Sequence, residues 1–173
     1  CLPSRSLGRA RFFSERKMPV IILDGGLGRQ LSEKGAPFRQ PEWSALALME
    51  APHTVREVHD QFIAAGADVI TTNTYAIAPF HIGEDRYEDQ GGALLELAAK
   101  LARDAADSVP REVQVAASVP PMFGSYLPEQ FEVQGARRMM LQFRRYLAPV
   151  ADIFVGETLG SVAEATTYLD VFS

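Results

Sequence analysis

The sequence predicts an α/β protein built around a parallel β-sheet. Four short apolar runs alternate along the chain with segments of helical periodicity, and glycines or prolines separate them. Apolar strands separated by helices favour a parallel sheet. Right-handed crossovers then leave two architectures, an open doubly wound sheet or a (β/α)8 barrel. The 173 residues make one domain or part of a larger one, and four strand–helix units would be half of a barrel.

The predicted strands are short apolar runs, each followed by polar or glycine residues. They span residues 20–23, 68–73, 113–117 and 153–155. The first, Val-Ile-Ile-Leu, reads as a buried strand because it is continuously apolar and ends at Asp24 and two glycines. Prolines and glycines predict long loops over residues 75–89 and 120–128.

The predicted helices carry an apolar residue at every third or fourth position. They span residues 27–34, 54–65 and 94–108, and a further helix includes residues 139–147. A last helix begins at Ser161. Thr54 with Glu57, and Ser161 with Glu164, have the spacing of capping boxes, so each pair predicts a helix start.

Composition excludes several classes of protein. The net charge is −5, so the chain lacks the basic surface of a nucleic-acid-binding protein. No apolar run approaches the roughly 18–20 residues of a membrane helix. The single cysteine, Cys1, excludes an internal disulfide framework and a cysteine-rich zinc site within the chain. We therefore expect a cytoplasmic protein.

Residues 1–17 differ from the rest of the chain. They hold five basic residues and one acidic residue, and they lack the long apolar stretch of a secretory signal. A transit peptide, a translated upstream region or an expression remnant would fit. We expect residues 1–17 to be an extraneous or disordered segment and residues 18–173 to form the domain, with Met18 as a possible natural start.

Polar residues follow each predicted strand, where α/β proteins place their sites. The two carboxylates among them, Asp24 and Glu157, should lie on one rim and could hold the ammonium group of an amino-acid-like ligand. Simpler interpretations stay open, since Asp24 can be a turn residue and Glu157 a solvated loop acid. A phosphate loop is not indicated, because Leu31 stands where G-x-G-x-x-G needs its third glycine.

Several motifs together resemble one known family. They are L-D-G-G-L-G-R-Q-L-S-E-K-G (23–35), W-S-A (43–45), V-H-D-Q-F (58–62) with A-G-A-D (65–68), T-T-N-T-Y (71–75), E-T (157–158) and E-A (164–165). In this order and spacing they resemble the homocysteine S-methyltransferase family. The resemblance covers about residues 20–169.

The resemblance implies a (β/α)8 TIM-type barrel, of which this chain holds about the first four βα units. It implies a methyltransferase that moves a methyl group from a donor such as S-methylmethionine, S-adenosylmethionine or betaine to the zinc-bound thiolate of homocysteine, giving methionine. It also implies a substrate site. Asp24 and Glu157 would hold the amino-acid end, Gly25 and Gly26 would let the ligand approach the backbone, and Thr74, Tyr75 and Thr158 would complete the pocket.

The family's zinc cysteines lie in the second half of the barrel, beyond the last residue of this chain. We therefore expect no zinc on this chain alone and assign no catalytic residue within it. A fragment of a longer protein is the favoured explanation. Self-association, pairing with a separate C-terminal half, and a degenerate inactive product are the others.

Two other functions stay open. One is a non-catalytic half-barrel that binds a ligand or a partner chain. The other is a different α/β enzyme, which the failed phosphate motif disfavours, as does the absence of a lysine at any strand end.

Overall fold

The structure, a computed structural model, describes residues 20–173. The predicted extraneous segment at residues 1–17 lies outside the described residues. The elements in chain order are α1 (Leu27–Glu33), α2 (Ser44–Glu50), α3 (Pro52–Ala64), β1 (Val69–Thr71), α4 (Pro79–Ile82), α5 (Glu84–Ala106), β2 (Gln114–Val119), the 3-10 turn η1 (Pro128–Gln130), α6 (Val133–Leu147), β3 (Ile153–Gly156) and α7 (Val162–Phe172).

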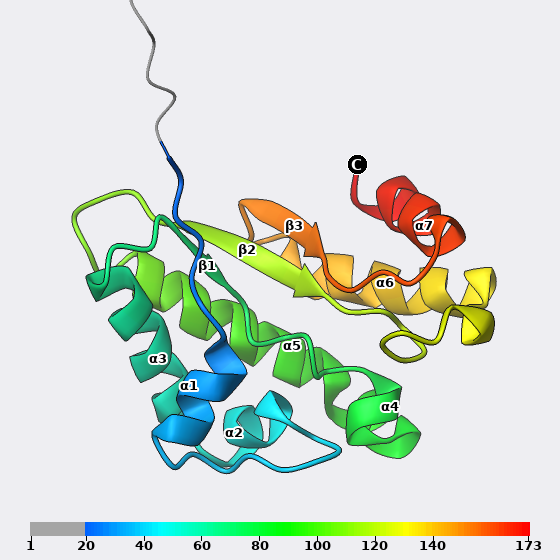
Figure 1. Cartoon of the computed structure of the whole chain (residues 1–173), viewed down its shortest axis with the longest axis horizontal. Helices are drawn as coiled ribbons and strands as arrows, with labels where there is room; N and C mark the ends of the chain where they lie inside the picture. Colours follow the sequence, from blue (N-terminus) through cyan, green and yellow to red (C-terminus); the bar gives the residue numbers. More distant parts are fainter. Residues whose placement is uncertain (1–19) are drawn as a thin grey trace, which may run out of the picture.

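The sheet is parallel, with its strands in the order β1-β2-β3. Ile70 is in register with Val115, and Ala117 with Phe154. The long helix α5 lies along the sheet and contacts both β1 and β2, and α6 contacts β2 beside it (Figure 1). The α/β class and the parallel sheet are therefore confirmed.

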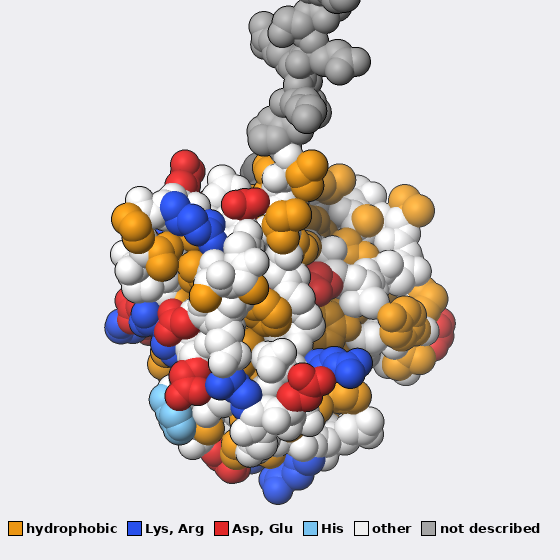
Figure 2. Space-filling view, turned by 60° about the vertical axis from the view of Figure 1, so that its left-hand side comes forward, with side chains coloured by type: hydrophobic (Ala, Val, Ile, Leu, Met, Phe, Trp, Pro, Cys, Tyr) orange, Lys and Arg blue, Asp and Glu red, His pale blue; other side chains and the backbone are white. Residues whose placement is uncertain are grey.

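Residues 20–23 run beside β1 but are not buried. Leu23 forms a parallel bridge with Val69, whose N–H donates to Ile22 O at 3.1 Å. The four side chains at 20–23 are nevertheless between 49% and 79% exposed. The prediction of a buried strand is wrong because, among residues 20–173, this segment has a strand neighbour on one side only. Figure 2 shows hydrophobic side chains exposed around the beginning of the described chain.

The predicted loop over residues 75–89 is wrong, because it contains α4 and the first turns of α5. The run that opens α5 is polar, so it lacks the apolar periodicity by which a helix is recognised. Its start is favoured instead by Glu84 and Asp85, two acids in the first turn where the helix dipole prefers negative charge.

Of the two predicted helix N-caps, the one at Ser161 is found in the structure and the one at Thr54 is not. Helix α3 begins at Pro52, with Ala51 as its N-cap and no side-chain cap bond, so the capping box at Thr54 is wrong. Proline suits a first helical position because its missing N–H would have no helical partner there. The cap at Ser161 is confirmed, since Ser161 Oγ accepts from Glu164 N–H at 3.1 Å.

Alanines let α5 approach the sheet and its helical neighbours closely. Ala98, Ala99, Ala102 and Ala105 are all at most 2% exposed, and α5 contacts both α3 and α6. Burying this face contributes about 25 cal/mol for each Å² of apolar surface removed from water. The core therefore lies between the sheet and the layer of α3, α5 and α6.

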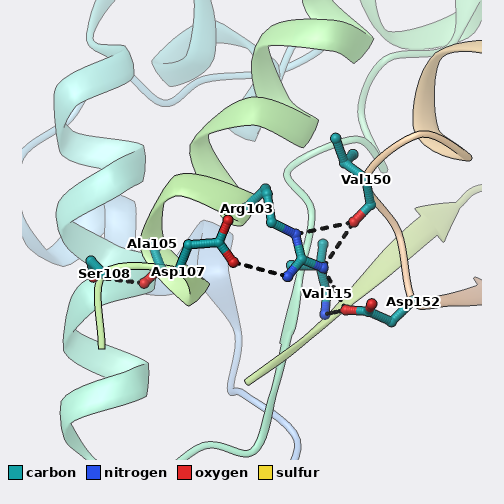
Figure 3. A network of polar contacts seen from close by, with 7 residues as sticks. All are labelled: Arg103, Ala105, Asp107, Ser108, Val115, Val150 and Asp152. Atoms are coloured by element: carbon teal, nitrogen blue, oxygen red, sulfur yellow. Dashed lines mark hydrogen bonds and ion pairs between the residues drawn. The ribbon is translucent and has the colours of Figure 1, made fainter. Parts of the chain in front are cut away.

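Arg103 of α5 bonds to the segments at the amino-terminal edge of the sheet (Figure 3). Arg103 near the end of α5 donates from Nε and Nη2 to Val150 O, at 3.2 and 2.9 Å, and from Nη1 to Asp107 at 3.2 Å. It also pairs with Asp152, whose carboxylate accepts from Val115 N–H at 2.7 Å. One side chain thus joins α5, the segment before β3 and the start of β2.

None of the helices in the described part of the chain is long and apolar enough to cross a membrane.

Candidate functional site

A cavity of about 640 Å³ opens at the carboxyl ends of the strands. The segments that follow residues 20–23, β1, β2 and β3 all contribute to it. Its polar lining consists of Gly25, Gly26, Gly28, Ser44, Thr71, Thr72, Asn73, Ser118, Gly124, Ser125 and Glu157. Its position is the one that parallel α/β architecture gives to binding sites.

Asp24 lies directly behind the cavity wall rather than on it. Its Oδ2 accepts from Thr71 N–H at 2.8 Å, and its Oδ1 accepts from Thr71 Oγ1 at 2.5 Å. Burial raises the pKa of the Asp24 carboxyl, although the hydrogen bonds from Thr71 lower it in part. Gly25 and Gly26, the next two residues, line the cavity. A Cβ on Gly25 would stand 3.0 Å from the Phe62 ring, so the backbone passes closely over α3.

Glu157 is the carboxylate on the cavity wall. Ser118 at the end of β2 donates its hydroxyl to Glu157 Oε1, which orients the carboxylate from the neighbouring strand. Ser118 itself is held by two buried threonines: its N–H donates to Thr72 Oγ1 at 3.1 Å, and its carbonyl accepts from Thr74 Oγ1 at 2.5 Å. Thr74 is fully buried and outside the cavity lining, so it touches the site through Ser118.

Tyr75 lines the cavity and joins two other loops. Its hydroxyl lies 2.6 Å from Ser125 Oγ and 2.8 Å from Thr158 Oγ1. Thr158 is therefore beside the cavity without lining it. Of the predicted site residues, the structure brings Gly25, Gly26, Tyr75 and Glu157 onto the cavity wall and leaves Asp24, Thr74 and Thr158 one contact behind it.

Backbone strain gathers around this cavity. In the described part of the chain the non-glycine residues with positive φ are Trp43 (47°), Tyr126 (64°) and Thr158 (53°). Trp43 and Tyr126 line the cavity, and Thr158 bonds to Tyr75. Such conformations cost on the order of 1–3 kcal/mol each and are found mainly at functional sites. We therefore take the cavity as the candidate functional site.

Sequence reasoning missed the aromatic wall of the cavity. Phe38, Trp43, Phe80, His81 and Tyr126 line it from the segment before α2, from α4 and from the loop after β2. Burial lowers the pKa of His81, and its Nδ1–H donates to Pro41 O at 2.8 Å, so the ring is a neutral wall at neutral pH. Only Trp43, within W-S-A, carried a sequence signal. The others come from loops and from the short helix α4, whose packing no local pattern reveals.

The described residues do not fit a zinc ion. Among residues 20–173 no group of three or more His, Cys, Asp or Glu side chains could hold a metal. The two site carboxylates are instead occupied with hydroxyl and backbone donors.

Comparisons with known proteins agree on one family. The family model for homocysteine S-methyltransferase matches residues 21–173. Homocysteine S-methyltransferase YbgG of Bacillus subtilis is 29% identical over 167 residues, which is 85% of this chain and 52% of that protein. Homocysteine S-methyltransferase 1 of Zea mays is 35% identical over 127 residues, 66% of this chain and 39% of that protein.

A solved structure shares the arrangement of the described elements. The metallated form of the homocysteine methyltransferase MmuM from Escherichia coli superimposes with a TM-score of 0.78 at 27% identity, covering 90% of this chain and 59% of that one. The chain thus spans about half the length of the curated relatives it matches. With the family model matching most of the chain, the protein belongs to the homocysteine S-methyltransferase family.

Proposed function

We propose that residues 18–173 form the N-terminal half of a (β/α)8 barrel and that its cavity binds the acceptor of a homocysteine S-methyltransferase. The observation that carries the proposal is the pair of carboxylates at one edge of the sheet. Glu157 lies on the cavity wall, and Asp24 lies behind Gly25 and Gly26 on the side of the first strand. Family membership supports it.

In this proposal Glu157 accepts from the ammonium group of homocysteine, and the negative charge of Asp24, behind Gly25 and Gly26, attracts that group from the other side. Glu157 is held by Ser118, so its second oxygen can accept from the ligand. Gly25 and Gly26 leave the backbone accessible to the amino-acid end, Tyr75 forms the wall, and Thr74 and Thr158 hold Ser118 and Tyr75 in place. The reaction transfers one methyl group from a donor such as S-methylmethionine, S-adenosylmethionine or betaine to the acceptor sulfur, giving methionine.

The zinc ion used by the family would need ligands from outside residues 20–173, since the described residues supply no suitable group. We propose that they come from the C-terminal half of the barrel, either within one longer polypeptide or on a separate chain that pairs with this half. Self-association of this half is the further possibility that we propose. A cytoplasmic location stays a prediction from composition.

A non-catalytic ligand- or partner-binding module is the second candidate. The observation in its favour is the same lack of a metal-holding group among residues 20–173. The two candidates differ in turnover. If the chain is part of the enzyme, we expect methionine to form from homocysteine and a donor once a C-terminal half is supplied. If it is a binding module, we expect binding without turnover.

Calorimetric titration with homocysteine tests the acceptor site. We expect Glu157→Gln to weaken binding by at least about tenfold, because a charged hydrogen bond is lost. Asp104→Asn is the matched control, since Asp104 is a carboxylate on the outer surface of α5 paired with Lys100. Equal affinity of Glu157→Gln and the parent chain would refute the role assigned to Glu157.

A further inference from the structure

Three hydroxyl groups from three separate loops meet at the carboxyl edge of the sheet. Tyr75 follows β1, Ser125 follows β2 and Thr158 follows β3. The Tyr75 hydroxyl contacts Ser125 Oγ at 2.6 Å and Thr158 Oγ1 at 2.8 Å. We call these three side chains the hydroxyl clasp. Tyr75 and Thr158 carry predicted binding roles, whereas none of the family motifs includes Ser125.

The clasp is a directional chain of hydrogen bonds. A phenol has a single proton, so Tyr75 donates to at most one of its two partners and accepts from at least one of them. Removing the Ser125 hydroxyl therefore leaves the Tyr75 hydroxyl with one partner instead of two and frees the loop after β2 from the loop after β1. The effect of one such bond is roughly fivefold in an equilibrium constant.

The clasp fastens backbone that is unfavourable without support. Ser125 stands between Gly124, with φ of 128°, and Tyr126, with φ of 64°, while Thr158 has φ of 53°. A side chain in this left-handed region is disfavoured sterically, so it persists where surrounding contacts hold it. The clasp supplies such contacts at Ser125 and at Thr158.

The fastened segments form two walls of the cavity. Tyr126 and Leu127, next to Ser125, line one side, and Glu157, next to Thr158, supplies the carboxylate. Tyr126 is 78% exposed, so few packing contacts hold its ring. Its position depends on the loop backbone, and that backbone is joined to Tyr75 through Ser125.

We propose that Ser125 is a positioning residue of the acceptor site. Through Tyr75 and Thr158 it fixes the distance between the Tyr126 wall and the Glu157 carboxylate. This inference rests on the proposed binding of homocysteine in the cavity. Ser125 itself neither reacts nor carries charge.

The test compares Ser125→Ala and Ser125→Thr with the parent chain. Homocysteine affinity is measured by calorimetry, and amide hydrogen exchange is followed in residues 124–127 and 157–159. We expect Ser125→Ala to lose roughly fivefold in affinity and to exchange faster in both segments, with an unchanged midpoint of global unfolding. Ser125→Thr keeps the hydroxyl and should restore both readouts.

Ser108→Ala is the matched control. It removes a serine hydroxyl that bonds to Ala105 O beyond the end of α5. It should change neither the affinity nor the exchange of the two segments. A loss in Ser108→Ala equal to that in Ser125→Ala would overturn the inference.

Two outcomes separate this inference from the proposed function. If the parent chain binds homocysteine and Ser125→Ala binds it equally well, Ser125 has no positioning role although the proposed acceptor site stands. If the parent chain binds no homocysteine, the acceptor site fails and the inference fails with it. If Ser125→Ala binds homocysteine more weakly and Ser125→Thr does so equally, the inference is also contradicted. The loss of the Ser125 hydroxyl would then not be the cause of the weaker binding.

Discussion

At the scale of single residues, Asp24 combines a cost to stability with a proposed role in binding. Burial raises the pKa of its carboxyl above the ordinary value of 3.8. The folded protein therefore holds this proton more tightly than the unfolded chain. As pH rises above 3.8 ionisation favours unfolding, so the charged Asp24 lowers the free energy of unfolding at neutral pH.

Asp24→Asn should separate stability from binding. Asparagine removes the buried charge and keeps one oxygen to accept from Thr71, so the unfolding midpoint in urea at pH 7 should stay equal or rise. Homocysteine affinity should fall by about tenfold, because the negative charge behind Gly25 and Gly26 that attracts the ammonium group is gone. Urea denaturation and calorimetry on one preparation check both. A lower midpoint with unchanged affinity would mean that Asp24 is a structural turn residue.

His59 should make the fold sensitive to mild acid. It is fully buried on α3, and neither ring nitrogen has a hydrogen-bond partner among the described residues. Burial lowers the pKa of His59 from 6.5 to about 4. Between pH 6.5 and 4, His59 is protonated in the unfolded chain but stays neutral in the folded protein. The free energy of unfolding therefore falls as pH drops from 6.5 towards 4. Between pH 7.5 and 5 the loss should be about 2 kcal/mol.

Urea denaturation at the two pH values measures this loss. His59→Leu should abolish most of it. His53→Leu, on the exposed side of the same helix, should retain it. An unchanged pH dependence in His59→Leu would show that another group is responsible.

The residues of the site were predictable to the extent that they stand at strand ends. Glu157 and Tyr75 follow recognisable strands. Because the carboxyl ends of parallel strands lie at the same edge of the sheet, both residues could be predicted to lie there. Ser118 as the partner of Glu157, and Ser125 as the partner of Tyr75, could not be foreseen. Each pair is about 40 to 50 positions apart in the chain, and its register depends on how the loops pack.

At the scale of elements, Arg103 fastens α5 to two strands. Arg103→Met keeps the apolar stem and removes the guanidinium, which takes away the donors to Val150 O and leaves Asp152 with the Val115 N–H alone. We expect the free energy of unfolding to fall by about 1–3 kcal/mol. Lys100→Met on the same helix breaks an exposed pair with Asp104 and should cost at most about 0.5 kcal/mol. Equal effects of the two variants in urea denaturation would contradict the fastening role.

Helices with apolar residues at every third or fourth position were predictable from the sequence. The starts of helices that open with polar residues were not. The stripe through Met140, Phe143 and Leu147 identified α6, but its start at Val133 depends on Glu132, whose carboxylate caps the N–H groups of Gln134 and Gly135. The polar opening of α5 falls within a predicted loop for the same reason. Apolar spacing records which face is buried and carries no information on where an exposed turn begins.

At the scale of the whole molecule, the exposed apolar segment at residues 20–23, beside β1, should promote association. Parallel strands are normally covered on both faces, and exposed strand edges are sites of pairing between chains. We expect sedimentation equilibrium to show a concentration-dependent increase in mass, and Ile21→Lys to reduce it. Leu141→Lys changes a comparably exposed side chain on α6 and should leave association unchanged. A monomer at all concentrations would contradict the proposed self-association.

We propose above that the cavity at the carboxyl edge of the sheet binds homocysteine. NMR titration of the isotopically labelled chain with homocysteine tests it most directly, because each backbone amide reports its own surroundings. We expect saturable shift changes at Gly25, Gly26, Tyr75, Ser125 and Glu157, and none around Arg103 at the opposite edge of the sheet. No saturable change, or changes confined to the Arg103 edge, would contradict it.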